Sequence, residues 1–208
     1  MRKQSGKTRT NDPEGTRNRV LDVAAVSFQR HGYSGTSVHD IVRDAKISGG
    51  ALAHHFPTKK AIALAVIAER VAAEIGSTWI EKFKTAASVA AGVEQVFEDV
   101  IQQLDGSTRI TGCPLNNLAL ELSLADKDFR RAIAKEYDAW RKAIESRVQT
   151  EMRSGRATYA AGDASGFATY VVAVFSGAIA IAKAHQNTAP LKVCLAQLRQ
   201  GFENRGHA

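Results

Sequence analysis

The residues with the most informative chemistry lie in the stretch ISGGALAHHFPTKK, which begins at Ile47. It reads as a short helix, a proline break and a second helix that starts with Lys59 and Lys60. The helix dipole disfavours cations at a helix start, but a phosphate placed there would attract both the dipole and the two ammonium groups. Gly49 and Gly50 leave the first turn of the short helix without Cβ atoms, which allows close approach to a bulky partner. The pattern predicts a helix that enters a DNA groove.

The basic charge gathers at the N-terminus. The chain has 28 Lys and Arg against 21 Asp and Glu, a formal net charge of +7. Residues 1–60 hold 11 basic against 5 acidic residues, and the remaining 148 hold 17 against 16. Such asymmetry indicates a polyanion as partner for the first third only.

Other kinds of chemistry find little support. Adjacent helical residues such as His54 and His55 point about 100° apart and cannot chelate one ion, so we expect no metal site. No nucleophile–base–orienter set is visible, so we expect no catalytic residues, no cofactor and no enzyme. Two cysteines, Cys113 and Cys194, are typical of a reducing cytoplasm, and no signal peptide is apparent. The uncharged run 164–182 could be read as a membrane span, but a buried interface helix explains it equally and is preferred.

The elements that position these residues are helices throughout. Apolar residues recur at helical spacing up to His31 and Gly32, Ser37 and Asp40 match a capping box, and Ser48 opens the third helix. With 44% hydrophobic residues the chain can bury a real core. Further helices are expected at about 59–83, 88–104, 115–122, 129–155, 163–186 and 190–203. We therefore predict an all-α fold.

Over Arg17 to Val66 the chain resembles the TetR family of transcriptional regulators. The resemblance rests on Phe28, Gly32-Tyr33, Thr36-Ser37-Val38, Ile41-Val42, Ala45-Lys46-Ile47-Ser48, Gly50-Ala51-Leu52, His55-Phe56 and Lys59. Two departures stand out: Lys46 replaces the usual glycine of the turn, and Ala53 replaces the customary tyrosine.

The resemblance implies a three-helix helix-turn-helix domain followed by a larger helical domain for effector binding and dimerisation. We expect a flexible basic arm at 1–12, the DNA-binding domain at 13–60 and the second domain at 61–208. The arm is either simply disordered or contacts DNA. A homodimer would bind double-stranded DNA at a pseudo-palindromic operator whose half-site centres lie about 34–36 Å apart.

The DNA-binding residues combine the family positions with the two helix starts. We assign His55 and Lys59 to phosphates, and Gly50, Ala51 and His54 to base edges or thymine methyls. The full set is Ser37, Ser48, Gly49, Gly50, Ala51, His54, His55, Lys59 and Lys60.

A small-molecule effector should bind the second domain, where residues 112–121 are similar to a Gly-Cys-x-x-x-Asn-x-x-x-Glu stretch found in one branch of the family. The candidates are aromatic and polar residues of the central helices, although core packing is the alternative for the aromatics. They are Trp79, Phe83, Phe97, Cys113, Asn117, Glu121, Tyr137, Trp140 and Phe175.

Cys113 also precedes a helix whose N-terminus could stabilise a thiolate, with Lys183 as a cationic neighbour. Sensing of oxidants or electrophiles is therefore one hypothesis, and an inert apolar cysteine is the other.

The last two long helices should form the dimer interface, since their apolar surface would be an aggregation hazard on a monomer. Burial within one subunit is the alternative. The interface candidates are Phe167, Val171, Val174, Ala178, Leu191, Leu195 and Leu198.

The predicted function is a ligand-responsive cytoplasmic regulator, most simply a repressor. An effector would release it by binding the DNA-incompetent state more tightly. An architectural or non-inducible DNA-binding protein is the alternative.

Overall fold

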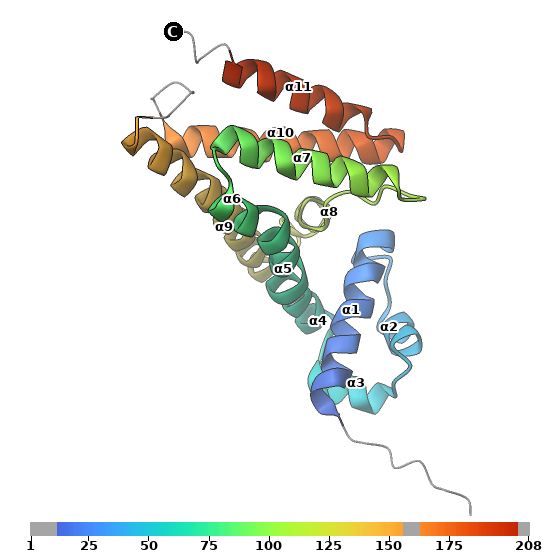
Figure 1. The fold of residues 1–208 in the computed structure, drawn as a ribbon. Helices are drawn as coiled ribbons and strands as arrows, with labels where there is room; N and C mark the ends of the chain where they lie inside the picture. The colour runs from blue at the N-terminus through green and yellow to red at the C-terminus, as the bar shows by residue number, and fades with distance from the viewer. Residues whose placement is uncertain (1–11, 156–162, 204–208) are drawn as a thin grey trace, which may run out of the picture.

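A computed structural model describes residues 12–155 and 163–203, and the described residues are helical with no strand (Figure 1). The predicted all-α class is confirmed. The expected basic arm lies almost wholly outside the described residues. The elements are α1 (Pro13–His31), α2 (Val38–Ala45), α3 (Gly49–His55), α4 (Lys59–Ala65), η1 (Val66–Val71), α5 (Ala72–Ile75), η2 (Gly76–Ile80), α6 (Glu81–Thr85), α7 (Val89–Asp105), α8 (Pro114–Leu122), α9 (Lys127–Arg153), α10 (Ala164–His185) and α11 (Ala189–Glu203).

Local capping explains where the first helices begin and end. The Asp12 side chain caps α1 by accepting from the Gly15 backbone N–H at 2.9 Å. The capping box of Ser37 and Asp40 opens α2 as predicted. Lys46 ends α2 at φ 54°, so this lysine takes the left-handed conformation that glycine usually supplies.

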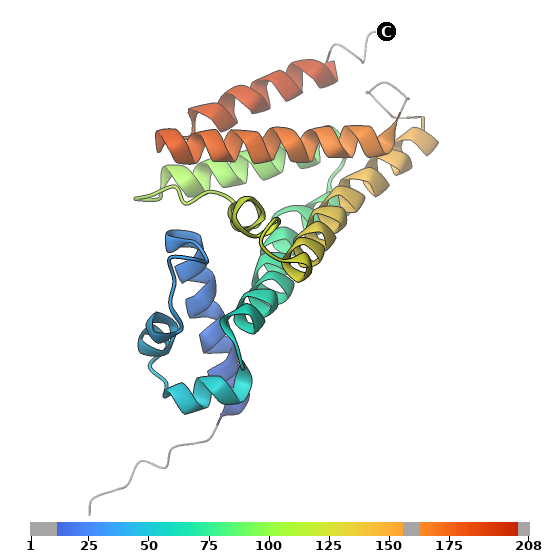
Figure 2. The same ribbon diagram turned by 180° about the vertical axis from the view of Figure 1, so that it is seen from behind.

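The second domain is built on two long helical pieces. The run from α4 through η1, α5 and η2 to α6 is continuous, with wider π-helical turns at η1 and η2, and it packs against α9. Helices α7, α10 and α11 lie side by side at the far end, and α1 to α3 form a separate group at the other end (Figures 1 and 2). Helix α8 lies between the two groups and contacts both α1 and α9.

An aromatic cluster forms the centre of the second domain. The ring centroids of Trp79 lie 4.8 Å from Trp140 and 4.9 Å from Phe175, and Phe97 lies 5.3 Å from Phe175. Phe83 stacks on Trp79 at 5.9 Å, and all five side chains are buried. These aromatics, expected to line an effector site, are mainly core, because their periodicity reports burial and not what buries them.

Helices α10 and α11 bury most of the predicted interface residues within the subunit, which was the alternative to an interface role. Val171 and Ala178 are buried within the subunit, as are Leu191, Leu195 and Leu198 of α11, while Val174 is half-buried and Phe167 packs on Phe202. The opposite faces carry Tyr170, Ile181 and Val193, whose exposed fractions are 54%, 50% and 62%. On a helix that is apolar all round, periodicity could not show which face turns inward.

Among the described helices, α10 is the one long and apolar enough to cross a membrane by length and composition alone. Its mean hydropathy reaches 1.8 in its most apolar window, and a third of that window is buried in the protein. Since α10 packs on α9 and α11, its apolar residues have a role in the fold.

Candidate DNA-binding helix and effector cavity

The first turn of α3 is bare, in that its two glycines carry no Cβ atoms, and no contact inside the protein requires glycine there. Gly49 and Gly50 are exposed, and neither has a positive φ angle. A Cβ atom added to either would meet nothing within 4 Å. Where the backbone conformation suits alanine, replacing glycine by alanine stabilises a protein by about 0.4–1 kcal/mol, so alanine at these positions would stabilise the free protein.

The remaining residues of α3 divide between an inner and an outer face. Leu52 points into the core, while His54 is exposed and His55 is half-buried. The Ser48 hydroxyl caps the helix by accepting from the Ala51 backbone N–H at 3.1 Å. Among the described residues, no group of three His, Cys, Asp or Glu side chains is arranged to hold a metal ion.

The two lysines that begin α4 have partners within the protein. The Lys60 ammonium donates to Asp126 at 2.6 Å and to Asp128 at 2.7 Å, which ties α4 to the start of α9. The Lys59 ammonium lies 4.2 Å from the centre of the Tyr33 ring. Burial lowers the pKa of Lys59, against the opposing effect of the Glu121 charge. Lys60 thus joins α4 to α9 through two carboxylates and is not the free phosphate ligand expected, whereas the phosphate role of Lys59 stays a prediction.

The Glu121 side chain binds the C-terminal end of α1, a contact that we call the Glu121 clasp. Its carboxylate accepts from the backbone N–H groups of Tyr33 at 2.8 Å and Ser34 at 2.6 Å. Burial raises the pKa of Glu121, but the hydrogen bonds from Ser34 and Tyr33 and the Lys59 charge outweigh it, so the net pKa is lowered. Gly32 has φ 77°, and a Cβ atom there would lie 3.0 Å from the carboxylate. Glu121, expected in an effector site, is therefore a contact between the domains.

Gln29 of α1 forms a second hydrogen-bonded contact between the domains, which we call the Gln29 clasp. Its side-chain amide donates to the Gly112 carbonyl at 2.6 Å and accepts from Asn117 at 3.1 Å. Lys183 in turn donates to Asn117 at 2.9 Å. Asn117, like Glu121, thus links the domains and does not line the cavity described below.

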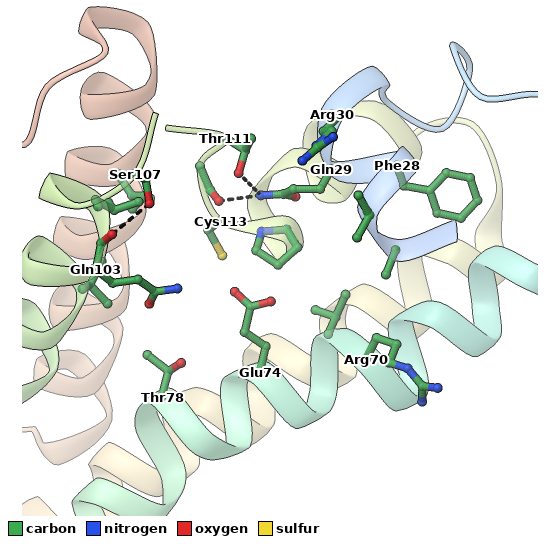
Figure 3. Close-up of a pocket in the computed structure, with 18 of the residues that line it drawn as sticks. Phe28, Gln29, Arg30, Arg70, Glu74, Thr78, Gln103, Ser107, Thr111 and Cys113 are labelled. Atoms are coloured by element: carbon green, nitrogen blue, oxygen red, sulfur yellow. Dashed lines mark hydrogen bonds between the residues drawn. The ribbon is translucent and has the colours of Figure 1, made fainter. Parts of the chain in front are cut away.

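A cavity of about 980 Å³ opens between the two domains. Its walls come from the C-terminal half of α1, the helical run from η1 to η2, α7, the segment 106–114, α8 and α10 (Figure 3). This volume lies at the upper end of the range of small-molecule sites. Because α1 forms one wall, a bound molecule would touch the DNA-binding domain directly.

The cavity contains some of the predicted effector residues and several that we missed. Trp79, Cys113 and Phe175 line it, whereas Phe83, Phe97, Tyr137 and Trp140 do not. The missed polar residues include Gln29, Glu74, Thr78 and Gln103. The cavity is also lined by a basic set that we did not predict, Arg30, His31, Arg70 and Arg109. A signal for two of them was present: Glu74 and Thr78 fall on the same helical face as Val71 and Ile75, where a core-facing stripe should be apolar.

The surroundings of Cys113 disfavour a reactive thiolate. Burial raises the pKa of its thiol to about 11, and the Glu74 charge acts in the same direction. The N–H groups of Asn116 and Leu115 at the start of α8 lower it, as the sequence suggested, but burial outweighs them. Lys183 bonds to Asn117. The position favours the inert cysteine over the thiolate hypothesis.

Two helical domains, the first of which contains a helix-turn-helix, are the arrangement of a DNA-binding regulator. The profile described as "Bacterial regulatory proteins, tetR family" matches residues 20–66, and "Transcriptional regulator LmrA/YxaF-like, C-terminal domain" matches residues 89–197. The chain belongs to the TetR family of transcriptional regulators.

Curated relatives extend along most of the chain. The HTH-type transcriptional regulator LmrA of Bacillus subtilis is 27% identical over 178 residues, covering 85% of this chain and 90% of the relative. The HTH-type transcriptional repressor DhaR of Mycobacterium sp. is also 27% identical, covering 84% and 86%.

Solved structures share the fold. Reduced NemR of E. coli is similar with a TM-score of 0.82 at 20% identity, covering 90% of this chain and 96% of that one. A TetR regulator from Chloroflexus aurantiacus has a TM-score of 0.80 at 24% identity, covering 91% and 94%.

Proposed function

We propose that this chain is a cytoplasmic repressor that binds a pseudo-palindromic operator as a homodimer and leaves it when a small molecule occupies the cavity. Membership of the TetR family and the similarity to DhaR, a transcriptional repressor, support the first part. The effector, the operator and the dimer are our inference.

The bare first turn of α3 carries the proposal. Gly49 and Gly50 make the free protein less stable than alanine would, and nothing in the protein needs the space. A duplex backbone or base edge lying against α3 gives that space a purpose, because close approach shortens the contacts of the helix N–H groups and of His54 with DNA. With few long side chains at this surface, sequence preference would depend on methyl contacts, His54 and DNA shape.

The position of the cavity suggests how release occurs. Hydrogen bonds of Glu121 and Gln29 hold the α1 wall to the second domain. A ligand that displaces α1 would therefore stretch or break these hydrogen bonds. If the ligand prefers a different setting of α1, it shifts the population away from the DNA-competent form. Each tenfold release requires about 1.4 kcal/mol of differential affinity for the two states.

Apolar side chains that are exposed to solvent in the single chain support the proposed dimer. Tyr170 and Ile181 of α10 and Val193 of α11 lie on the exposed faces of two helices that pack together. Gly177 lies on α10, and a Cβ atom added there would meet nothing within 4 Å, which permits close approach of a second helix. A two-fold pairing of α10 and α11 would cover this surface and set two α3 helices on successive major grooves.

The test is fluorescence anisotropy of the full chain on DNA from its own upstream region, with scrambled DNA of equal length, at about 150 mM salt. We expect saturable binding at least a hundredfold tighter to the upstream DNA. Equal weak binding to both would favour an architectural protein. No binding to either, over the upstream DNA and neighbouring intergenic regions, would refute the DNA-binding surface assigned to α3.

A further inference from the structure

Two hollows meet beside the C-terminal half of α1. One is the cavity between the domains, and the other is a smaller hollow of about 350 Å³ whose lining comes from α1, the segment 109–111 and α10 and its end. Gln29, Arg30, Arg109 and Thr111 line both of them. Lys183 of α10 adds a third cation to the smaller hollow. We call these five residues the basic corner.

The basic corner has no fixed counter-charge. Within residues 12–155 and 163–203, no carboxylate forms an ion pair with Arg30 or Arg109, and the lining of the smaller hollow includes no Asp or Glu. Lys183 donates to Asn117, an uncharged amide, at 2.9 Å. Two of the three cations come from residues 61–208, which hold 17 basic against 16 acidic residues, so the cluster does not follow from composition. An anion placed among these cations would offset their mutual repulsion.

The other charged residues of the cavity leave the basic corner as its anion-binding part. Arg70 donates to Asp22 at 2.7 Å, so its charge already has a partner. His31 follows Arg30 at the end of α1 and adds no negative charge. Glu74 points into the cavity from the long helical run, and Arg30 lies across from it on α1 (Figure 3). Repulsion from Glu74 would therefore direct a negative group toward α1.

The groups around the corner suit a carboxylate that is attached to an apolar body. A guanidinium presents its N–H groups in a plane that matches the two oxygens of a carboxylate. The Thr111 hydroxyl accepts from Gln29 at 3.3 Å and can donate its own proton to a bound acid. Farther into the cavity, Trp79 and Phe175 contribute aromatic surface and Ile179 contributes aliphatic surface.

We infer that the cavity binds an organic acid, with its carboxylate in the basic corner and its aromatic or aliphatic body against Trp79 and Phe175. This inference rests on the proposed function, because it names the chemical class of the effector. The carboxylate joins Arg30 of the DNA-binding domain to Arg109 and Lys183 of the second domain. Its binding therefore depends on the setting of α1, which is the wall that the two domains share.

The test compares two probes of similar shape that differ in charge, 2-naphthylacetate and its neutral amide, 2-naphthylacetamide. Equilibrium dialysis at neutral pH gives the Kd of each probe for the full-length wild type, Arg30→Gln and Arg109→Gln. Arg130→Gln is the matched control, since it removes the same charge from an exposed residue of α9 outside the lining of both hollows. Thermal unfolding of each variant checks the fold.

We expect the wild type to bind naphthylacetate about fivefold tighter than the amide, or more, because only the acid gains from the cations. Arg30→Gln and Arg109→Gln should each weaken naphthylacetate about fivefold and change the amide less than about twofold. Arg130→Gln should leave both probes within about twofold. Added salt should weaken the acid and spare the amide. Both arginines are exposed, so a variant that did not fold would overturn the premise that its arginine lacks a partner.

Equal affinities of the two probes for the wild type would overturn the inference. Equal losses for both probes in the arginine variants, no loss for either, or absence of naphthylacetate binding to the wild type would also do so. The operator assay without probe is read separately. Specific DNA binding without charge-selective probe binding rejects the organic acid and leaves the DNA-binding part of the proposed function standing. Failure of operator binding, with charge-selective probe binding retained, does the reverse.

Discussion

Replacing Gly50 by alanine should change stability and DNA binding in opposite directions. The position is helical without a positive φ angle, and the new methyl group meets nothing within 4 Å. Fewer conformations are then available to the unfolded chain, which stabilises the fold by about 0.4–1 kcal/mol. For a chain of this size, Tm should rise by roughly 1–4 °C.

The same methyl group would stand where we place the DNA. A lost or displaced contact at a specific site costs about 1–3 kcal/mol, which corresponds to roughly 5- to 150-fold in Kd. Non-specific binding depends mainly on charge and should change far less. The loss should therefore appear as reduced discrimination between the operator and scrambled DNA.

Gly76→Ala is the matched control for Gly50→Ala. Gly76 is helical, its Cβ would also meet nothing within 4 Å, and it lies on the long helix away from α3. It should give a similar rise in Tm with unchanged operator affinity. Thermal unfolding by circular dichroism and anisotropy on the operator measure the two effects. If Gly50→Ala raised Tm while operator affinity stayed within twofold of wild type, our reason for the bare turn would be refuted.

Three other predictions concern the clasp, the thiol and the dimer. Glu121→Ala should cost about 2 kcal/mol and speed amide exchange at the end of α1, because two N–H groups lose a charged acceptor; unchanged exchange would contradict the clasp. Since the folded pKa of Glu121 is lowered, its contribution is present above its unfolded pKa of about 4.3 and is lost as pH falls through the folded pKa, so the stability gap between wild type and Glu121→Ala should close on acid titration. Cys113, with a pKa near 11, should be about 0.1% thiolate at pH 8, so iodoacetamide should label it slowly in the folded chain and readily in urea by mass spectrometry; equal labelling in both would show it accessible. If the proposed dimer forms through α10 and α11, Ile181→Lys should make the protein monomeric in analytical ultracentrifugation and weaken operator binding. A variant that stays dimeric would place the interface elsewhere.

Local features could be predicted from the sequence because they depend on neighbours along the chain. Helical spacing, the Ser37 and Asp40 box and the Ser48 cap all act within four residues, and the structure has each of them. The glycine pair of α3 could be read in the same way, since its meaning is the absence of side chains.

Contacts between distant segments could not be predicted. Lys60 resembled a phosphate ligand until α9 brought Asp126 and Asp128 to it, 66 and 68 residues away. Glu121 resembled a ligand-binding residue, but α8 places it against the end of α1. A charged or polar side chain that becomes buried needs a hydrogen-bond or ion-pair partner, and only the fold decides which partner is within reach.

The sequence by itself determined an all-α chain with a basic, glycine-faced helix-turn-helix at its N-terminus, because these properties follow from periodicity, capping and composition. The tertiary structure alone decided which aromatic residues are core, which faces of α10 and α11 remain open, and that Glu74 faces a cavity shared by the two domains. The physical reason is that burial and desolvation depend on how helices pack across the chain, and a helical repeat contains no record of the surface on the other side.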